Sequence, residues 1–263
     1  MKTCLKKLML NNHFPQLLLA LTQKEIKARY KHAVLGFLWI FINPLVQMMV
    51  MGFVFSLVFR FNIENYYLFL FTGLLPWNFF SLALNKATPR IVWDRNLIQK
   101  AKFPREVIPL SIILSHFFHF LVSWLMLIIY LILTKQWQFF TLSAISQQTL
   151  AIILLLVFAS GLSLITSSLT VFYRDIKFIV QMGVMLWFYA TPIIYPFSAV
   201  PQQYRSIFYL NPLTGLYSLL QKPLTDNLVP PAVLLIQVFL ILLISLLGIL
   251  IFKKREKEFS DWL

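Results

Sequence analysis

The sequence predicts an all-α membrane protein with six transmembrane helices, an amphipathic interface helix before the first of them and re-entrant helices in the last external loop. Three observations support this prediction: six long apolar stretches, a composition with 59% hydrophobic and 12% charged residues, and a one-sided distribution of lysine and arginine. Soluble domains carry about 25% charged residues, so this chain has too few charges to cover a water-soluble fold.

The six apolar stretches are the candidate spans. A bilayer core about 30 Å thick needs about 20 apolar residues in helical conformation. The second and fifth stretches are marginal by this measure, and the other four are long enough. The stretches are Val34–Phe59, Tyr66–Leu84, Val107–Leu133, Leu150–Phe172, Phe178–Ile194 and Ala232–Phe252. We therefore expect one transmembrane domain over residues 34–252.

The basic residues indicate the orientation, because loops rich in lysine and arginine stay in the cytoplasm. With six spans, residues 1–33, 85–106, 173–177 and 253–263 lie on one side and hold all but four of the 23 Lys and Arg residues. The sequence thus predicts a multi-pass protein of the bacterial inner (plasma) membrane with both termini in the cytoplasm. Attraction to anionic lipid accounts for the net charge of +14, without nucleic acid. The four exceptions are Arg60, Lys135, Arg205 and Lys222.

The N-terminal segment, residues 1–33, is basic and contains the pattern of an amphipathic helix over Phe14–Lys31. Pro15 suits a first helical turn, and Glu25 and Arg29 have the i,i+4 spacing of a helical ion pair. Two roles remain open for this helix: it lies in the headgroup plane beside the first span, or it docks a cytosolic subunit.

The first span carries a polar stripe formed by Trp39, Asn43 and Gln47. Polar side chains within a membrane span face protein or water rather than lipid. The stripe therefore either makes hydrogen bonds between helices or lines a translocation path. Pro44 is expected to kink the same helix.

The cytoplasmic loop over residues 85–106 mixes basic with apolar residues and carries signals for a short helix or a helix pair. Thr88-Pro89 is a reasonable start and Phe103-Pro104 a reasonable stop. Such an element either rests on the lipid surface or acts as a lever that docks into a partner, and the loop over residues 173–177 could serve likewise. The basic C-terminal tail over residues 253–263 is a separate cytoplasmic segment.

The external segment over residues 191–231 contains seven prolines, which forbid one long helix. Its apolar parts suit short re-entrant helices covered by protein. An ordinary external loop and an outer gate both fit this pattern. The residues expected at such a gate are Pro192, Tyr195, Pro196, Asn211 and Pro212.

Aromatic residues are a further candidate lining for the path, because their faces stack on the apolar faces of sugar rings. Trp39 in the first span and Trp187, Phe188 and Tyr189 in the fifth are the candidates. Lipid-facing packing explains most of the other aromatic residues.

Several chemistries have no sequence signature here. The chain contains no G-x-x-x-x-G-K-[ST] phosphate loop and no catalytic motif, so we expect no catalytic residue, no metal and no cofactor on this chain. His116 and His119 are the titratable groups within the spans, and packing is a more natural role for them than metal binding. No Asp or Glu lies within a span, so the energy for any transport is expected from elsewhere.

Five short blocks resemble the permease subunits of polysaccharide-exporting ABC transporters of the type 2 exporter class, which include O-antigen, capsule and teichoic acid exporters. The first is residues 27–45, KARYKHAVLGFLWIFINPL, and the second is residues 97–110, LIQKAKFPREVIPL. Residues 173–176 (YRDI), 191–196 (TPIIYP) and 211–214 (NPLT) follow in the same order. The resemblance covers most of the chain, from about residue 22 to about residue 220.

The resemblance implies a permease that pairs with a second copy of itself and with two copies of a cytosolic nucleotide-binding ATPase subunit, which holds the ATP and Mg²⁺. It also implies a path along the dimer axis for a glycan attached to a polyprenyl diphosphate, closed at its outer end by residues 191–220. The residues that it matches to ATPase contacts are Lys24, Lys27, Arg29, Ile91, Trp93, Arg95, Lys100, Phe103, Arg105, Arg174 and Asp175.

Positive charge at the cytoplasmic face should draw the lipid diphosphate toward Arg29 and Lys31. Two other functions stay open: export of a drug or small lipid by the same architecture, and a membrane scaffold without transport.

Overall fold

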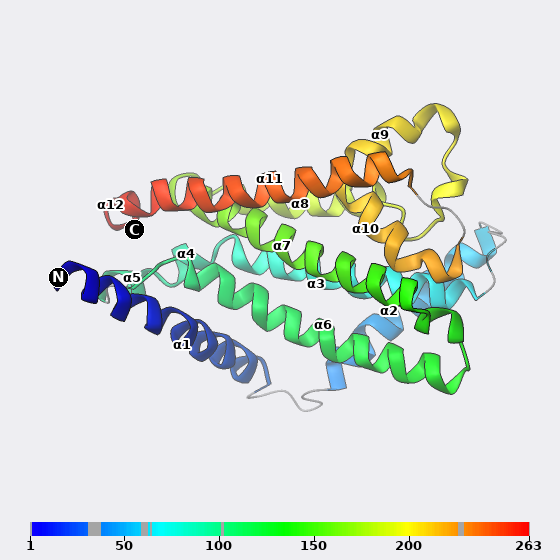
Figure 1. The fold of residues 1–263 in the computed structure, drawn as a ribbon, viewed down its shortest axis with the longest axis horizontal. Coiled ribbons are helices and arrows are strands. Elements are labelled where there is room, and N and C mark those ends of the chain that lie inside the picture. The colour runs from blue at the N-terminus through cyan, green and yellow to red at the C-terminus, as the bar shows by residue number, and fades with distance from the viewer. Residues whose placement is uncertain are drawn as a thin grey trace.

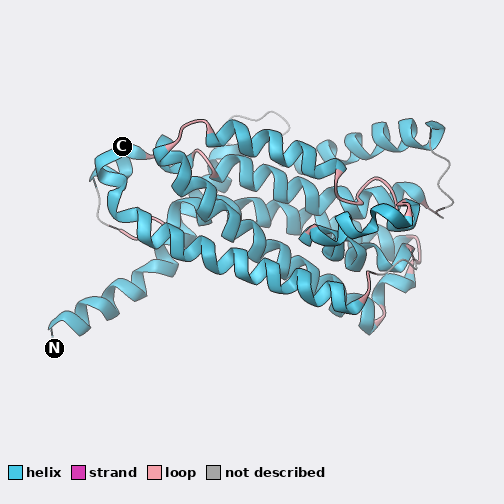
Figure 2. Cartoon of the chain, turned by 90° about the horizontal axis from the view of Figure 1, so that it is seen from above, coloured by secondary structure: helices cyan, strands magenta, loops and turns pink. Residues whose placement is uncertain are grey.

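The computed structural model describes residues 2–30, 38–58, 63, 65–100, 103–225 and 229–262. Within these ranges the chain is helical throughout, with short loops and no strand, so the predicted all-α class is confirmed there. Both termini lie at one end of the molecule, together with α4 (Arg90–Trp93) and α5 (Arg95–Lys100), whereas α9 (Arg205–Leu210) and α10 (Pro212–Gln221) lie at the opposite end (Figure 1). Figure 2, turned by 90°, again shows the two termini at one end.

Among the described residues, five helices are long and apolar enough to cross a membrane, which makes this a multi-pass membrane protein. They are α2 (Trp39–Val58), α3 (Tyr66–Ala87), α6 (Val107–Leu133), α7 (Leu142–Phe172) and α11 (Pro231–Arg255). The predicted fifth span is shorter than expected. Its helix, α8 (Ile176–Tyr189), stops three residues before Pro192, since proline disfavours helix in the residue preceding it and has no N–H to donate.

Two other boundaries differ from the prediction. The helix α7 starts eight residues before the predicted Leu150, because the Thr141 hydroxyl caps it by accepting from the Ala144 N–H at 3.3 Å. The N-terminal helix α1 runs from Lys2 to Tyr30, so Pro15 lies inside the helix rather than in its first turn. Lys31 and residues 32–37, which include the start of the predicted first span, lie outside the described residues.

The main core lies between α3, α6, α7 and α10. Phe80 of α3 and Phe158 of α7 are stacked at 5.8 Å, and the Trp187 ring meets both of them edge-on. The α7 and α11 helices approach closely because both contribute glycine at the crossing. A Cβ on Gly248 would lie 2.3 Å from the Gly161 carbonyl oxygen, so only small residues permit this packing.

A second, smaller core lies at the end that holds the termini. Ile91 of α4, Ile98 of α5 and Phe103 pack there against the ends of α6, α7 and α11. The chain then turns through η6 (Glu256–Glu258) into α12 (Phe259–Trp262), where Phe259 meets Phe252 edge-on at 5.5 Å. The helices α4 and α5 and the C-terminal segment are therefore folded onto the helix bundle, whereas the N-terminal part of α1 projects from it (Figure 2).

The opposite end is made of short helices, as the prolines predict. The helix α6 is followed there by η2 (Trp137–Phe140), and α8 by η3 (Phe197–Ala199), η4 (Gln202–Tyr204), α9, α10 and η5 (Lys222–Leu224). Every residue of α10 is buried, and the helix packs against α3, α7 and α11.

Candidate functional site

A polar cavity of about 660 Å³ lies between α2, α3, α6 and the C-terminal end of α1. Trp39, Asn43 and Gln47, the predicted stripe of the first span, all line it. The remaining polar lining comes from Arg29 of α1, Asn78 and Ser81 of α3, and His116, His119 and Ser123 of α6. As far as the structure describes the lining, it contains one guanidinium and no carboxylate, so the cavity favours anions.

The stripe makes a hydrogen bond between helices, which is one of the two roles that the sequence left open, and it also faces the cavity. The Asn78 amide donates to Gln47 Oε1 at 2.8 Å, which ties α2 to α3. Trp39, in contrast, remains 48% exposed and Asn43 is also exposed, so these two side chains are accessible from the cavity.

Pro44 has a visible consequence for α2. Proline lacks an N–H, so the carbonyl of Ile40, four residues earlier, loses its usual helical partner. The Ser123 hydroxyl of α6 lies 3.3 Å from this carbonyl and 3.1 Å from the carbonyl of His119. The proline thus creates an acceptor on α2 that α6 can satisfy.

Arg29 meets the two histidines of α6 at the edge of the cavity. Its guanidinium donates to His116 Nε2 at 2.7 Å, which requires a neutral His116 ring with that nitrogen unprotonated. His119 Nδ1 donates to the Ser115 carbonyl, so the second guanidinium nitrogen, 3.4 Å from Nδ1, is a close neighbour rather than a donor to it. The two imidazoles are only 5% and 7% exposed.

The sequence did not reveal this cluster. The one-turn spacing of the histidines was visible, but no local pattern connects Arg29 to a residue 87 positions away. Its signal was the presence of ionisable groups within a span, which mark functional sites in membrane proteins. No group of three or more His, Cys, Asp or Glu suited to a metal occurs within the described part of the chain.

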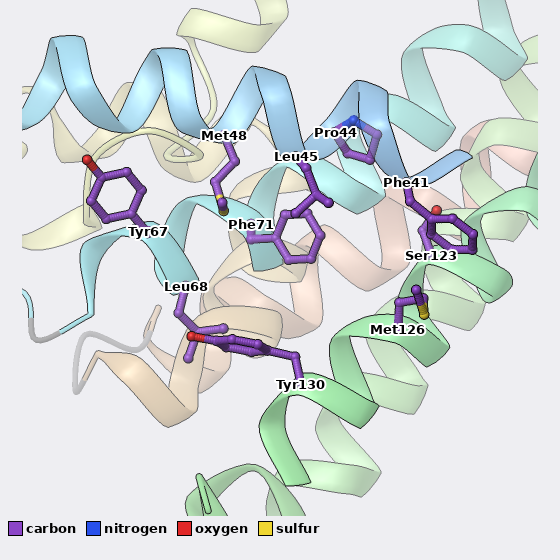
Figure 3. Close-up of a pocket in the computed structure, with 10 residues that line it drawn as sticks. All are labelled: Phe41, Pro44, Leu45, Met48, Tyr67, Leu68, Phe71, Ser123, Met126 and Tyr130. Carbon is purple, nitrogen blue, oxygen red and sulfur yellow. The ribbon is translucent and has the colours of Figure 1, made fainter. Parts of the chain in front are cut away.

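An apolar groove of about 290 Å³ adjoins the polar cavity at Pro44. Figure 3 shows the residues that line the groove. Pro44 and Ser123 line both spaces, so the two meet there. In Figure 3 the side chains of Leu45, Phe71 and Met126 point into the gap between α2, α3 and α6. The other lining residues are Phe41, Met48, Tyr67, Leu68 and Tyr130.

The residues predicted to contact an ATPase fall into two groups. Most are exposed: Trp93, Arg95, Lys100, Arg174 and Asp175 at the end that holds the termini, and Lys24, Lys27 and Arg29 toward the C-terminal end of α1. Phe103 and Arg105 are half-buried, and Arg105 donates to the Glu256 carbonyl. Ile91 has no exposed surface, so it anchors α4 to the bundle instead of facing a partner. Lys31 lies outside the described residues.

An ion pair joins two parts of this end. Arg90 of α4 donates to Glu25 of α1 at 2.5 Å and to Asp94 at 2.7 Å. The predicted interface helix and the predicted lever are therefore linked directly.

The aromatic candidates of α8 lie away from the polar cavity. Trp187 is half-buried between Phe80 and Phe158, Phe188 packs on Trp77 at 5.4 Å, and Tyr189 is 57% exposed. None of the three belongs to the residues that line the cavity of Trp39.

Two of the candidate gate residues, Asn211 and Tyr195, make side-chain hydrogen bonds at the opposite end. The side-chain oxygen of Asn211 caps α10 by accepting from the Leu213 N–H at 3.0 Å, and it also accepts from the Trp187 indole at 2.8 Å. The side-chain amide of Asn211 donates to the Ala190 carbonyl at 3.0 Å and to the Thr191 hydroxyl at 2.9 Å. The Tyr195 hydroxyl donates to the Tyr189 carbonyl at 2.8 Å.

Prolines complete this end of the molecule. Pro192, Pro196 and Pro212 are buried, and Pro212 occupies the first turn of α10. The hydrogen bonds of Asn211 join the end of α8 to the start of α10.

The model of the ABC-2 type transporter family matches residues 16–225. The chain belongs to this family. The matched segment contains α2 to α10 and most of α1, including every candidate site residue described above.

Relatives match over nearly their whole length. The O-antigen export system permease protein RfbA of Klebsiella pneumoniae is 33% identical over 245 residues, covering 93% of this chain and 94% of the relative. The protein of the same name from Myxococcus xanthus is 33% identical over 250 residues, with the same coverage. The polysialic acid transport protein KpsM of Escherichia coli is 22% identical over 242 residues, covering 90% of this chain and 93% of the relative.

Proposed function

We propose that this chain is the transmembrane subunit of an ATP-driven exporter that moves a polyprenyl-diphosphate-linked polysaccharide, such as O-antigen, capsule or teichoic acid, across the bacterial inner membrane. The observation that carries the proposal is the 33% identity to O-antigen export permeases over 93% of this chain. The similarity to a polysialic acid transport protein extends it to a second polysaccharide. ATP and Mg²⁺ bind to a separate subunit in this proposal, and this chain catalyses no reaction.

Six crossings fit the arrangement best. The helix α8 is about 21 Å long at the helical rise, short of a bilayer core of about 30 Å, but the chain continues through Ile194. With α8 as the fifth crossing, an even number of spans joins the two termini, which lie at one end (Figure 1). The positive charge at that end supports a cytoplasmic location.

The helix α10 is a re-entrant element in this proposal. It is about 15 Å long, half the depth of a membrane core, and all ten of its residues are buried. Backbone that does not cross the membrane is tolerated at this depth only where protein covers it. Together with the network of Asn211 it forms the outer gate.

Coupling to two copies of the ATPase is assigned to the end that holds the termini. The exposed Trp93 and the exposed cations of α1 and α5 offer a contact surface, and Arg90 links α4 to α1. A push on α4 would therefore also move α1. The exposed turn at Arg174 and Asp175 gives a second contact.

A second copy of the chain is assigned to the apolar faces of α2 and α8. The span of α2 is only 11% buried within one chain, and α8 exposes Phe178, Ile179, Met182 and Met185. A path between two copies would be lined by α2 and α8, and so by Trp39, Asn43 and Tyr189 from each copy.

Deleting the gene in its native cell and fractionating lipid-linked glycans tests the proposal. We expect polymer to accumulate on the cytoplasmic side while the surface glycan disappears, with restoration by the wild-type gene. An unchanged surface glycan would contradict the proposal and favour export of a drug or small lipid. Co-purification of an ATPase subunit would exclude the scaffold.

A further inference from the structure

We propose that the polar cavity and the apolar groove on the two sides of Pro44 form one binding site for the prenyl diphosphate end of the exported glycan, within a single copy of the chain. This inference rests on the proposed function and names residues that would hold the substrate. Four observations support it, taken in turn below.

The first observation is the charge at the polar end. The guanidinium of Arg29, the buried imidazoles of His116 and His119 and the amide of Asn43 lie around a cavity whose described lining has no carboxylate. A guanidinium has five N–H groups in a fixed fork that matches phosphate oxygens, and the exposed Arg29 reaches this cavity while donating to His116. A diphosphate, with several anionic oxygens, complements such a site.

The second observation is the character of the groove that meets the cavity. It is lined by aromatic, aliphatic and methionine side chains, which adapt to an irregular hydrocarbon chain. Tyr67, Met126 and Tyr130, which lie on α3 and α6 rather than on the faces assigned to a second copy, are 44%, 44% and 52% exposed, so the groove opens sideways to the bilayer. A lipid can enter it from the membrane without crossing the headgroup layer.

The third observation is the direction from one space to the other. His116 lies nine residues after the start of α6, about 14 Å along the helix, and Tyr130 lies about 21 Å farther on. The groove therefore extends from the cavity toward the end of the molecule opposite the termini, where Tyr67 and Leu68 stand in the first turn of α3. A bound lipid would lie with its diphosphate on the side of the termini and its hydrocarbon chain on the opposite side.

The fourth observation separates a glycan carrier from an ordinary phospholipid. Asn43, Gln47, Asn78 and Ser81 give the cavity amide and hydroxyl groups that exchange hydrogen bonds with sugar hydroxyls. Its volume of about 660 Å³ lies within the usual range of ligand pockets, about 300–1,000 Å³, so a phosphate alone would leave most of it empty.

The site also has a built-in means of closing. The contact between the Ser123 hydroxyl and the Ile40 carbonyl stands where the two spaces meet. A chain that passes from the cavity to the groove must displace or skirt this contact, so binding should move α2 away from α6.

The test uses the purified full-length chain in detergent and radiolabelled undecaprenyl diphosphate as the probe. We expect saturable binding that Arg29→Gln weakens about tenfold to a hundredfold, the equivalent of one or two charge-assisted hydrogen bonds. Lys254→Gln removes an exposed cation in the last turn of α11, which does not line the cavity, and should leave binding unchanged. Equal loss in both variants would mean non-specific attraction and would overturn the proposal.

A second pair of variants tests the groove. Met126→Trp fills it and should weaken binding at least as strongly as Arg29→Gln. Leu125→Trp places the same ring at the preceding position of α6, which is 56% exposed and outside the groove, and should bind as wild type. Unchanged binding by Met126→Trp would overturn the proposal.

Competition identifies the ligand class. We expect undecaprenyl diphosphate to be displaced by itself and not by phosphatidylglycerol or inorganic diphosphate. Displacement by phosphatidylglycerol at equal concentration would reassign the site to bilayer phospholipid, and displacement by inorganic diphosphate would reduce it to an anion site. Either result overturns this inference while the export assay in cells still stands, whereas an unchanged surface glycan in the deletion strain would reject the proposed function itself.

Discussion

The replacement of Asn211 by alanine provides the sharpest test of the outer network. The Asn211 side chain joins three parts of the chain through four hydrogen bonds, to Trp187, Leu213, Ala190 and Thr191. Asn211→Ala removes all four at once and leaves the Trp187 indole and the first turn of α10 without their acceptor.

The expected loss of stability follows from this count. A hydrogen bond in a folded protein contributes about 1 kcal/mol net, and loss of a helix N-cap costs a similar amount, so Asn211→Ala should cost about 3–4 kcal/mol. Trp187→Phe removes one of the four bonds and keeps most of the packing on Phe80 and Phe158, so it should cost about 1 kcal/mol. For a chain of this size each kcal/mol lowers Tm by about 2–4 °C.

The assay is thermal unfolding of the purified chain in detergent, followed by size-exclusion chromatography. We expect Tm to fall by about 10 °C for Asn211→Ala and about 3 °C for Trp187→Phe. In the double variant, Trp187→Phe should lower Tm by less than it does in the wild-type background, because Asn211→Ala has already removed the hydrogen bond between the two residues. Asn96→Ala, at an exposed position of α5, is the control. A Tm for Asn211→Ala within about 2 °C of wild type would refute a rigid hub at Asn211.

Three further predictions follow from other contacts. Glu25→Arg and Arg90→Glu each break the ion pair between α1 and α4, and each should lower glycan export at least by half. The double variant reverses the ion pair and should recover part of the export. No recovery would show that the pair does not couple these helices. Gly248→Leu places a Cβ 2.3 Å from the Gly161 carbonyl oxygen and should prevent accumulation of folded protein. Its control is Gly183→Leu, whose Cβ would meet nothing within 4 Å and which should accumulate as wild type. Normal levels of Gly248→Leu would reject the close crossing of α7 and α11. In a Cys4→Ser background, a membrane-impermeant maleimide should label Gln138→Cys in spheroplasts and Asn96→Cys only after lysis, and the opposite pattern would reverse the proposed orientation.

The class of the fold and most of its long helices were predictable, because apolar runs of this length have few other solutions. The start of α7 was not, since Leu142–Thr149 is only moderately apolar and its helical state depends on the cap at Thr141. The end of α8 was also not predicted: the predicted span continued to Ile194, whereas the helix ends at Tyr189, before Pro192. Helix ends are determined by single side chains and caps, to which averaged hydropathy is insensitive.

The site was predictable only in its local part. The stripe of Trp39, Asn43 and Gln47 follows from helical spacing alone, and the structure places all three on one cavity. The contact between Arg29 and His116 joins residues 87 positions apart, and no periodicity relates them. Glu25 shows the same limit: its local partner by spacing was Arg29, whereas the structure shows it bound to Arg90, 65 positions away.

The distribution of rigid and loose contacts indicates which part of the chain moves. The span of α3 is 72% buried and α10 is buried throughout, so the core and the end that holds α10 resist displacement. The span of α2 is 11% buried, and Pro44 has removed one of its internal hydrogen bonds. Its side-chain hydrogen bonds to other helices, at Gln47 and at the Ile40 carbonyl, both lie beside the cavity among the described residues. A ligand that competes for these groups would break the two hydrogen bonds and release α2 while α3 stays fixed. Substrate binding and opening of the path would therefore both require the loss of these two hydrogen bonds. Gln47→Leu removes the hydrogen bond that Asn78 donates to α2, so it should loosen the packing of α2 on α3. We expect this variant to raise ATP hydrolysis by the assembled transporter in the absence of glycan.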